Sequence, residues 1–389
     1  MAVAERQKPG GGRVFAVMPV FNRLTYTQAC LRCLAGQTYP FVSIIVVDGG
    51  STDGTVEIVG RDSPHVTVLS GQDLWWSGAM KLGIECALAR GPRDDEFILM
   101  VNNDTVLPKD YVETLVRVSR REDAAVAAVI ADADRPSEIL EAGVTVRWDD
   151  YSLHVRQDLP VDGQSFFEVN VLPGRGTLIP IHMIRRVGNV AAARLPHYIA
   201  DYELTHRMYR AGYRLGVTSE TRLLSHRQTT GIAASTEAIG FARVYRMLTD
   251  RRSMANLRDH LGFVASCAPP HLRARIRRQL FRGALGALLF QTEARAVARP
   301  LRRLVKMLTG HDLISRTWLE RRHIDIPGLV QTGLLSEVYD GWFRIVPTAC
   351  APELRRVRRR LRLAAWNPIT KPRRWWQVRR VRRAAATGP

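Results

Sequence analysis

Apolar runs and amphipathic segments alternate along the first 130 residues, and no other feature of this chain restricts its fold as strongly. Five runs have the composition and length of buried strands, namely 14–20, 43–47, 66–69, 97–101 and 124–130. Four segments between them have helical periodicity, namely 25–35, 55–60, 78–90 and 109–121. Short strands that alternate with helices form parallel sheets covered on both faces. We therefore predict an α/β domain with a Rossmann-like, mostly parallel central sheet.

Three aspartates lie where such a sheet would bind ligands. Asp48 closes the run 43–47, Asp104 follows the run 97–101, and Asp201 begins a helix-like stretch. Open α/β sheets bind ligands in the crevice at the carboxyl ends of their strands. We therefore expect the three carboxylates to surround one crevice. Such a cluster could hold a divalent metal, a nucleoside diphosphate and a hydroxyl group that loses its proton.

The pattern changes after residue 140. We expect short strands, then helices, then more strands; these are strands at 166–172 and 176–180, helices at 181–187 and 201–211, and strands at 214–218 and 222–225. Gly212 would end the second helix. Beyond about residue 240 the chain is Arg-rich, has helical periodicity and is interrupted by prolines. We predict a helical extension there.

Charge divides the chain in the same place. The net charge is −3 over residues 1–239 and +23 over residues 240–389, which together make the +20 of the whole chain. The two parts therefore meet different partners. We predict a flexible segment at 1–12, a folded domain at 13–239, a helical extension at 240–350 and a basic tail at 351–389.

Several classes of protein are disfavoured. With 46% hydrophobic residues the 389-residue chain can bury a core, so wholesale disorder is not expected. It has no apolar run of 18 residues, so we predict no transmembrane helix, and we see no signal peptide at the N-terminus. The five cysteines include one C-x-x-C pair, Cys30 and Cys33, without a second pair. We expect reduced, buried thiols in the cytoplasm, with a redox or metal role as the alternative.

Short motifs occur in order between residues 14 and about 230. They are 17–23 and 45–55 at the first two strand ends, 76–84, Asn102-Asn103-Asp104, the glycine loop 173–180, and 200–204. Each alone is a weak signal, but their order is specific. The set resembles the family 2 glycosyltransferases with the GT-A fold, in particular bacterial rhamnosyltransferase-like members. The resemblance implies an enzyme that moves a hexose from a nucleotide sugar to a hydroxyl of a glycan or lipid-linked glycan.

The resemblance also implies which residues bind the donor. Aspartate is a good acceptor for base N–H and ribose hydroxyl groups, which suits Asp48. The donor-side positions implied by the resemblance are Pro19, Phe21, Arg23, Asp48, Lys81, Asn103 and Asp104. Asp48 and Asp53 could instead be turn and capping residues.

A divalent cation, Mg²⁺ or Mn²⁺, is implied as the cofactor that neutralises the leaving diphosphate. Hard cations prefer oxygen ligands, so Asp104 is the candidate carboxylate. The family often has aspartate where this chain has Asn102, which leaves one charge fewer. His226 follows a predicted strand where the family often places a further metal ligand. A purely structural His226 is the alternative.

The acceptor hydroxyl needs a general base. By resemblance this base is Asp201, while the glutamate that usually precedes it is Ala200 here. Glu203 projects to another side of the helix and is expected to support the site. A role for Asp201 as an N-terminal helix carboxylate remains the structural alternative. One carboxylate base without a carboxylate nucleophile implies a single displacement with inversion.

Further positions are expected on the acceptor or diphosphate side. Trp75 and Trp76 are expected in a glycine-bounded loop, where they could flank a sugar ring or simply pack in the core. Arg175 and Gly176 lie in the glycine loop, and Arg175 could reach the diphosphate.

Residues 355–383 carry 13 Lys and Arg and no acidic residue, with three tryptophans among them. A solvated tail, nucleic-acid binding and attachment to anionic lipid are all physically reasonable. Beside an enzyme-like domain we favour lipid, which implies peripheral attachment at the inner face of the cell membrane. The donor would be UDP- or dTDP-linked, and the acceptor a glycan or polyprenyl-linked glycan of a cell-surface polysaccharide. The alternative is a basic nucleic-acid-binding protein whose α/β domain is not catalytic.

Overall fold

The structure is a computed structural model that describes residues 11–159, 163–226, 241–290, 313–315, 335–339 and 342–345. The chain divides into two compact units. One consists of residues 1–235 and 245–284, and the other of residues 236–244 and 285–389. The first unit contains the large sheet.

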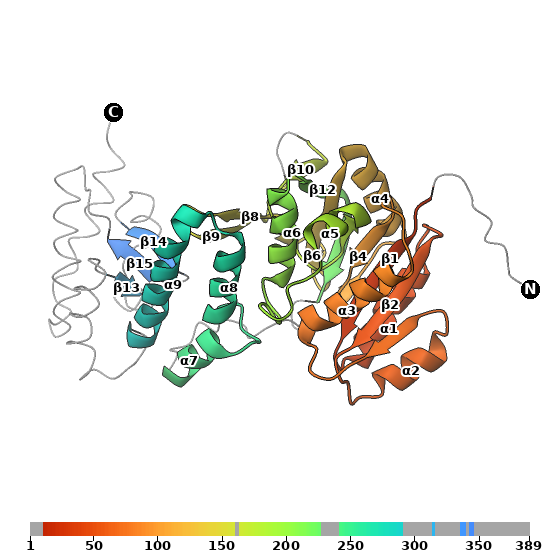
Figure 1. Ribbon diagram of the computed structural model, residues 1–389, viewed down its shortest axis with the longest axis horizontal. Helices are drawn as coiled ribbons and strands as arrows, with labels where there is room; N and C mark the ends of the chain where they lie inside the picture. Colours follow the sequence, from red (N-terminus) through yellow and green to blue (C-terminus); the bar gives the residue numbers. More distant parts are fainter. Residues whose placement is uncertain are drawn as a thin grey trace, which may run out of the picture. The chain divides into compact units, whose positions relative to one another are not determined.

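Strands and helices alternate at the start of the chain, as predicted (Figure 1). The first ten elements are β1 (Val14–Val20), α1 (Leu24–Ala35), β2 (Val42–Asp48), α2 (Thr55–Asp62), β3 (Thr67–Ser70), α3 (Trp75–Ala89), β4 (Phe97–Met100), β5 (Thr105–Val106), α4 (Tyr111–Glu122) and β6 (Ala124–Asp132). The five predicted strands are all present with ends that differ by at most two residues. Trp75 and Trp76 begin α3 and are not in a loop, which differs from the expectation.

The next eight elements begin with five short strands. They are β7 (Ile139–Glu141), β8 (Val144–Arg147), β9 (Ser152–Val155), β10 (Phe166–Glu168), β11 (Thr177–Pro180), α5 (Ile181–Val187), α6 (Ala200–Arg210) and β12 (Arg214–Ser225). The two strands expected at 214–218 and 222–225 form one strand, β12, with an irregular register between Thr218 and Arg222. Gly212 follows α6 with a φ of 92°, which a glycine adopts without strain.

The central sheet is mixed but mostly parallel. Along it the strands lie in the order β10-β12-β6-β11-β4-β1-β2-β3, with β5 paired to β12 and β7 paired to β6. β10 and β11 run against their neighbours, and the other six strands of this path run in one direction. This is the α/β architecture, with helices on both faces, that the sequence predicted, and it agrees with the GT-A fold implied by the resemblance.

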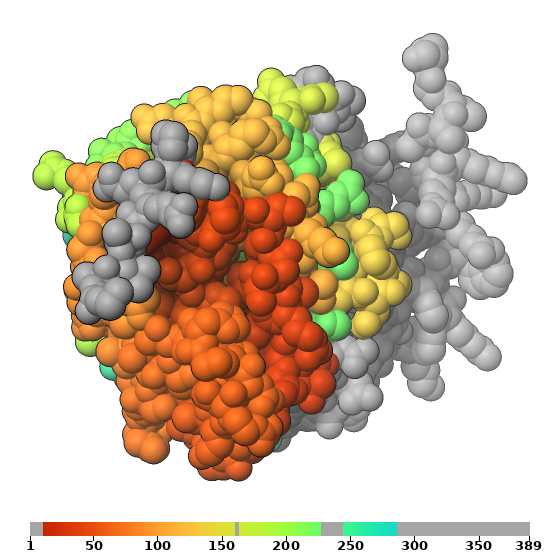
Figure 2. Space-filling model, turned by 90° about the vertical axis from the view of Figure 1, so that its right-hand side faces the viewer, coloured from red at the N-terminus to blue at the C-terminus, as the bar shows by residue number. Residues whose placement is uncertain are grey.

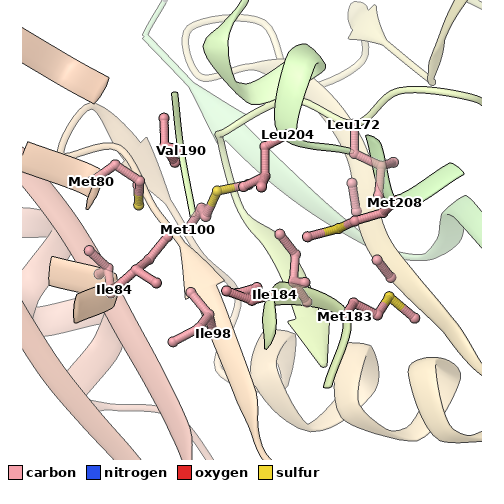
Figure 3. Packing of buried hydrophobic residues seen from close by; sticks show 14 of the residues in the cluster. Met80, Ile84, Ile98, Met100, Leu172, Met183, Ile184, Val190, Leu204 and Met208 are labelled. Carbon is pink, nitrogen blue, oxygen red and sulfur yellow. The ribbon is translucent and has the colours of Figure 1, made fainter. Parts of the chain in front are cut away.

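Successive residues of a strand point to opposite faces, so each face has its own core. Phe15 and Val17 of β1 pack on one side, against α3, α5 and α6. Figure 3 shows side chains of α3, β4, α5 and α6 meeting there, among them Met80, Met100, Ile184 and Leu204. Val14 and Ala16 pack on the other side, with α1, α2 and α4. In Figure 2 residues of the first part of the chain, in red and orange, form most of the front of the molecule.

The strand directions bring several loops to one edge of the sheet. β1, β2, β4 and β12 are parallel, so the residues that follow them emerge at the same edge. β11 is antiparallel to β4, and Thr177 at its start pairs with Met100 at the end of β4. The loop before β11 therefore reaches that edge as well. We call it the carboxyl edge, and it is where Asp48 and Asp104 lie.

The C-terminal part contains α7 (Phe241–Thr249), α8 (Leu257–Cys267), α9 (Pro270–Phe290), β13 (Leu313–Ser315), β14 (Leu335–Tyr339) and β15 (Trp342–Ile345). The three strands form a small antiparallel sheet that helical periodicity did not predict. α8 and most of α9 belong to the first compact unit. In the described parts of the chain, we find no helix with the length and apolarity that crossing a membrane requires. The basic tail at 351–389 and the N-terminal segment at 1–10 lie outside the described residues.

Candidate active site

Asp104 lies just beyond β4 and is almost fully buried, at 1% exposure. Arg23, which follows the neighbouring strand β1, donates a hydrogen bond from Nη1 to Asp104 Oδ2 at 3.3 Å. The backbone N–H of His226, at the end of β12, donates to the Asp104 carbonyl oxygen at 3.1 Å. The His226 ring lies against Tyr26, with 5.1 Å between ring centroids. Asp104 and His226, both predicted as metal ligands, are thus neighbours.

A series of contacts connects the end of β4 with Asp201. The indole Nε1 of Trp76 donates to Asn102 Oδ1 at 2.9 Å. The Trp76 ring lies directly against Gly174. A Cβ added to that glycine would come within 2.3 Å of the ring. The Gly174 N–H in turn donates to Asp201 Oδ2 at 2.6 Å. Asp104 and Asp201, far apart in sequence, therefore border the same stretch of the carboxyl edge.

The environment of Asp201 suits a proton acceptor. Its other oxygen accepts a hydrogen bond from the Tyr202 N–H at 2.9 Å. Burial raises the pKa of the Asp201 carboxyl above its ordinary value, while these two amides and the Arg175 guanidinium act in the opposite direction. A carboxylate with a raised pKa is a stronger base, and the two N–H groups hold it in one orientation.

Arg175 stands beside Asp201 in the loop before β11. Its Nη1 donates to Ser225 Oγ at 3.3 Å, and its Nη2 lies 3.9 Å from Glu141 Oε2. Glu141 ends β7 and is only 7% exposed. Burial raises the pKa of the Glu141 carboxyl to about 7, the Asp201 charge adds to this, and Arg175 opposes it. Glu141 was not among the residues predicted from the sequence. The available signal was a carboxylate that closes a short apolar run, Ile139-Leu140.

Asp48 serves the turn that follows β2. Its Oδ2 accepts hydrogen bonds from the N–H groups of Gly50 and Ser51 at 2.9 and 3.0 Å. These contacts correspond to the turn role that the sequence left open. They use part of the carboxylate, whose two oxygens have about four acceptor sites, and the residue is buried at 2% exposure.

Asp53 is a structural residue. It accepts hydrogen bonds from the Leu24 N–H at 2.9 Å and from the Thr55 N–H at 3.2 Å, at the starts of α1 and α2. Pro19 is buried within β1, whereas Phe21 is 56% exposed beside the carboxyl edge. Of these two predicted donor-side residues, Phe21 is the one whose ring is accessible to a ligand.

Two other predicted residues are engaged by protein groups. The Lys81 ammonium pairs with Glu85 on its own helix at 2.8 Å. The Asn103 Nδ2 donates to Thr27 Oγ1 of α1 at 3.0 Å. The Lys81 pair is exposed to solvent, whereas Asn103 is buried, and the donor-binding role of both residues stays a prediction.

Glu203 lies within the protein and supports α6. It is 1% exposed, accepts a hydrogen bond from Arg207 Nε at 3.0 Å and another from the Ser266 hydroxyl of α8. The glutamate thus ties α6 to α8, which is compatible with the supporting role expected of it.

Trp75 has polar and basic neighbours. Its ring lies edge-on to His197, with 5.6 Å between centroids, and the guanidinium of Arg251 stands 5.6 Å from its centroid. Trp76, by contrast, packs against the core cluster shared by α3 and α6. The core-packing alternative therefore applies to Trp76, although its Nε1 also orients Asn102.

Gly176 is required by the backbone of the glycine loop. Its φ is 78°, and an added Cβ would lie 2.3 Å from the Tyr111 hydroxyl and 2.4 Å from a Leu223 methyl. We expect Gly176→Ala to lower the free energy of unfolding by about 2–5 kcal/mol, from left-handed strain plus overpacking. Gly91→Ala is the control, because Gly91 has a φ of 61° but no described atom within 4 Å of its Cβ. Urea unfolding of both variants measures the difference, and equal losses would contradict a steric role for Gly176.

The donor groups around Asp104 are compatible with a hard divalent cation that is completed by substrate. In the described part of the chain, no cluster of three or more His, Cys, Asp or Glu could hold a metal. Asp104 and His226 supply two possible ligands. Magnesium typically takes one or two carboxylates and draws its remaining ligands from substrate phosphates and water. The Arg23 guanidinium lies 3.3 Å from Asp104 Oδ2, so a metal ion would share this carboxylate with Arg23.

The four described cysteines are free. Cys30 is buried in α1, and burial raises its pKa to about 12, so its thiol is not reactive near neutral pH. Cys267 is buried as well, whereas Cys33 and Cys86 are half-buried. The expected burial therefore holds for two of these four thiols. Cys350 lies outside the described residues.

Comparison with known proteins gives two family matches. Residues 15–158 match the profile described as glycosyl transferase family 2. Residues 97–313, more than half of the chain, match the profile described as glycosyl transferase family group 2.

The individual proteins that resemble this chain share a third of its residues or fewer over the matched regions. The uncharacterized glycosyltransferase YibD of Escherichia coli K12 is 31% identical over 124 residues, which are 31% of this chain and 34% of that protein. The match thus spans about a third of the length of YibD. The succinoglycan biosynthesis protein ExoA of Rhizobium meliloti is 24% identical over 258 residues, 63% of this chain and 73% of that one.

Among solved structures, the mannosyltransferase PcManGT from Pyrobaculum calidifontis, in complex with GDP-Man and Mn²⁺, has a TM-score of 0.44 and 14% identity over 78% of this chain and 77% of that one. GalNAc-T7 with UDP, GalNAc and Mn²⁺ has a TM-score of 0.47 and 9% identity over 71% of this chain and 55% of that one.

Proposed function

The chain belongs to family 2 of the glycosyltransferases, and from this premise we propose that it transfers a hexose from a nucleoside diphosphate sugar to a hydroxyl of a glycan, with inversion at the anomeric carbon. The observation that carries the proposal is the position of Asp201. Its carboxylate is held by two N–H groups beside the loop that also carries Arg175, on the same edge of the sheet as Asp104.

Donor binding follows from the arrangement at the carboxyl edge. Phe21 offers an exposed ring to the nucleobase at the ends of β1 and β2. Asp104 and His226 would hold a Mg²⁺ or Mn²⁺ ion, which when bound acts as a Lewis acid on the leaving diphosphate. Arg23, which pairs with Asp104, and Arg175 supply positive charge in this region, and both could contact phosphate oxygens once the donor is present.

Transfer itself needs only one carboxylate on the acceptor side. The acceptor hydroxyl donates its proton to Asp201 as its oxygen attacks the anomeric carbon, and the diphosphate leaves from the opposite face. Single displacement inverts the configuration of the sugar. The Arg175 guanidinium acts on the Asp201 carboxylate, and it would also supply positive charge to the departing phosphate.

The acceptor class is inferred from relatives. ExoA, the relative matched over most of its length, is named as a succinoglycan biosynthesis protein, and this supports a glycan or lipid-linked glycan of a cell-surface polysaccharide as the acceptor here. A UDP- or dTDP-linked donor and attachment of the basic tail to an anionic membrane surface complete the proposal.

A panel of nucleotide sugars tests the proposal directly. We expect the full chain, with Mn²⁺ or Mg²⁺, to release nucleoside diphosphate from one or a few of them, and the release to stop with EDTA. Product anomers identified by NMR should be inverted relative to the donor. Turnover with a retained configuration, or no turnover with any UDP-, dTDP- or GDP-linked hexose, would refute the proposal.

A further inference from the structure

Glu141 is a buried carboxylate that the proposed reaction does not use. At 7% exposure it is cut off from most solvent. Its Oε1 has no hydrogen-bond partner among the described residues, and its Oε2 has one cation, Arg175, at 3.9 Å. Leaving a buried carboxylate this poorly satisfied costs free energy of folding. A buried polar group without a partner needs a physical explanation, and carboxyls with shifted pKa values cluster at functional sites.

The neighbours of Glu141 belong to the active site. Arg175 extends from the loop before β11 and is held on its other side by Ser225 Oγ at 3.3 Å. The residue before it, Gly174, donates its N–H to Asp201.

The charged groups that act on Glu141 are Arg175, from the loop before β11, and Asp201, from α6. The Tyr202 phenol of α6 also interacts with both carboxylates, but burial and these two charges raise its pKa well above its ordinary value, so it remains protonated near neutral pH. The guanidinium also acts on Asp201, so one cation serves two carboxylates.

We propose that Glu141 is a positioning residue of the transferase site, which holds the Arg175 guanidinium beside the Asp201 carboxylate and shares this cation with the base. The inference rests on the proposed function for Asp201. Glu141 does not touch the reacting atoms. It acts through Arg175, and it makes Asp201 a stronger base when its own carboxyl is ionised, because part of the positive charge is then neutralised.

The consequence is a pH dependence of the base strength. Burial and the Asp201 charge raise the pKa of Glu141 to about 7. Below that pH Glu141 is neutral and Arg175 acts fully on Asp201. Above it the Glu141 charge offsets Arg175, so the proton affinity of Asp201 increases. We therefore expect kcat to rise in a step near pH 7.

Glu141→Gln removes this ionisation and keeps the shape of the side chain. The variant should fold. Because the Glu141 pKa is raised from 4.5 to about 7 in the folded protein, the wild type loses folding free energy as pH rises through this range, and glutamine avoids that loss. Glu138→Gln is the matched control. Glu138 lies three residues away and pairs at 2.9 Å with Arg135, an exposed residue.

Two measurements decide the matter. First, we expect Glu141→Gln to lose the step in kcat near pH 7 and to turn over several-fold more slowly above it, with Glu138→Gln like wild type. Second, the Glu141 carboxyl is titrated by ¹³C NMR, with its resonance assigned from its absence in Glu141→Gln. Its pKa should fall in Asp201→Asn, which lacks the negative neighbour, and rise in Arg175→Gln, which lacks the cation.

The outcomes are distinct. A pH profile in Glu141→Gln of the same shape as wild type would overturn the proposal, even if the variant were less stable. So would a Glu141 pKa that neither Asp201→Asn nor Arg175→Gln changes. Failure of the proposed function would appear differently, as a wild-type protein that turns over no nucleotide sugar. In that case the titrations still determine whether the three charges are coupled.

Discussion

Replacing Asp201 with asparagine is expected to lower kcat by about 10²- to 10⁴-fold, the usual contribution of a general base. Asparagine has nearly the same shape, and its Oδ1 can still accept the Gly174 or Tyr202 N–H, but it cannot take the proton of the acceptor hydroxyl. Donor affinity should change little because the donor site proposed here lies at the ends of β1, β2 and β4. Steady-state kinetics and nucleotide-sugar titration calorimetry measure the two effects.

The pH dependence of the wild-type enzyme should follow from the same carboxylate. Only ionised Asp201 accepts a proton, so kcat falls as pH decreases through its pKa. Since burial raises the pKa of Asp201, this fall begins at a higher pH than for an ordinary aspartate. The residual activity of Asp201→Asn should lack this acid limb.

A control separates chemistry from folding. Asp62→Asn makes the same change at an exposed position in α2, where the carboxylate pairs with Arg61, and should leave kcat unchanged. Thermal unfolding of both variants checks that they are folded. If Asp201→Asn is folded and transfers sugar at nearly the wild-type rate, Asp201 is not the base.

Replacing Asp104 with asparagine is expected to remove the metal-dependent part of donor affinity. In Mn²⁺ the dissociation constant for the nucleoside diphosphate should increase at least about tenfold, because loss of even a supporting group of a metal ligand costs about 10- to 100-fold. In EDTA, where no metal contributes, variant and wild type should bind alike. Titration calorimetry with and without metal measures both.

Asp110→Asn provides the comparison for this experiment. Asp110 is exposed just before α4, six residues after Asp104, and its side chain makes no capping hydrogen bond. It should bind donor as wild type does in both conditions. Unchanged affinity of Asp104→Asn in Mn²⁺ would show that Asp104 is not a metal ligand, and its role would then be to pair with Arg23.

Much of the fold was predictable because its signals are local. β1 was predicted with its observed ends, because a continuous apolar run of seven residues is typical of a strand that is buried on both faces of a parallel sheet. α5 was also predicted with its observed ends. β12 was split into two strands, because the polar residues at its register irregularity resemble a turn. The small sheet of β13, β14 and β15 was missed because short strands in an Arg-rich segment have no clear period.

The candidate site was predictable in part. Asp104 and Asp201 were singled out because they end or begin regular elements at the carboxyl edge. Lys81 and Asn103 were chosen by motif alone, and in the structure they pair with Glu85 and Thr27. A motif records which residues occur together, but it does not show which neighbour each side chain contacts.

The sequence by itself determined the alternation of strands and helices, the position of aspartates at the ends of those elements and the charge difference between the two parts of the chain. These depend on hydrophobic period and on residue type, which act over a few residues. Only the tertiary structure decided that Trp76 and Gly174 connect Asn102 with Asp201, and that Glu141 lies 3.9 Å from Arg175. Those contacts join residues at least 26 positions apart, and the raised pKa values of Asp201 and Glu141 arise from burial, which exists only when the distant segments pack together.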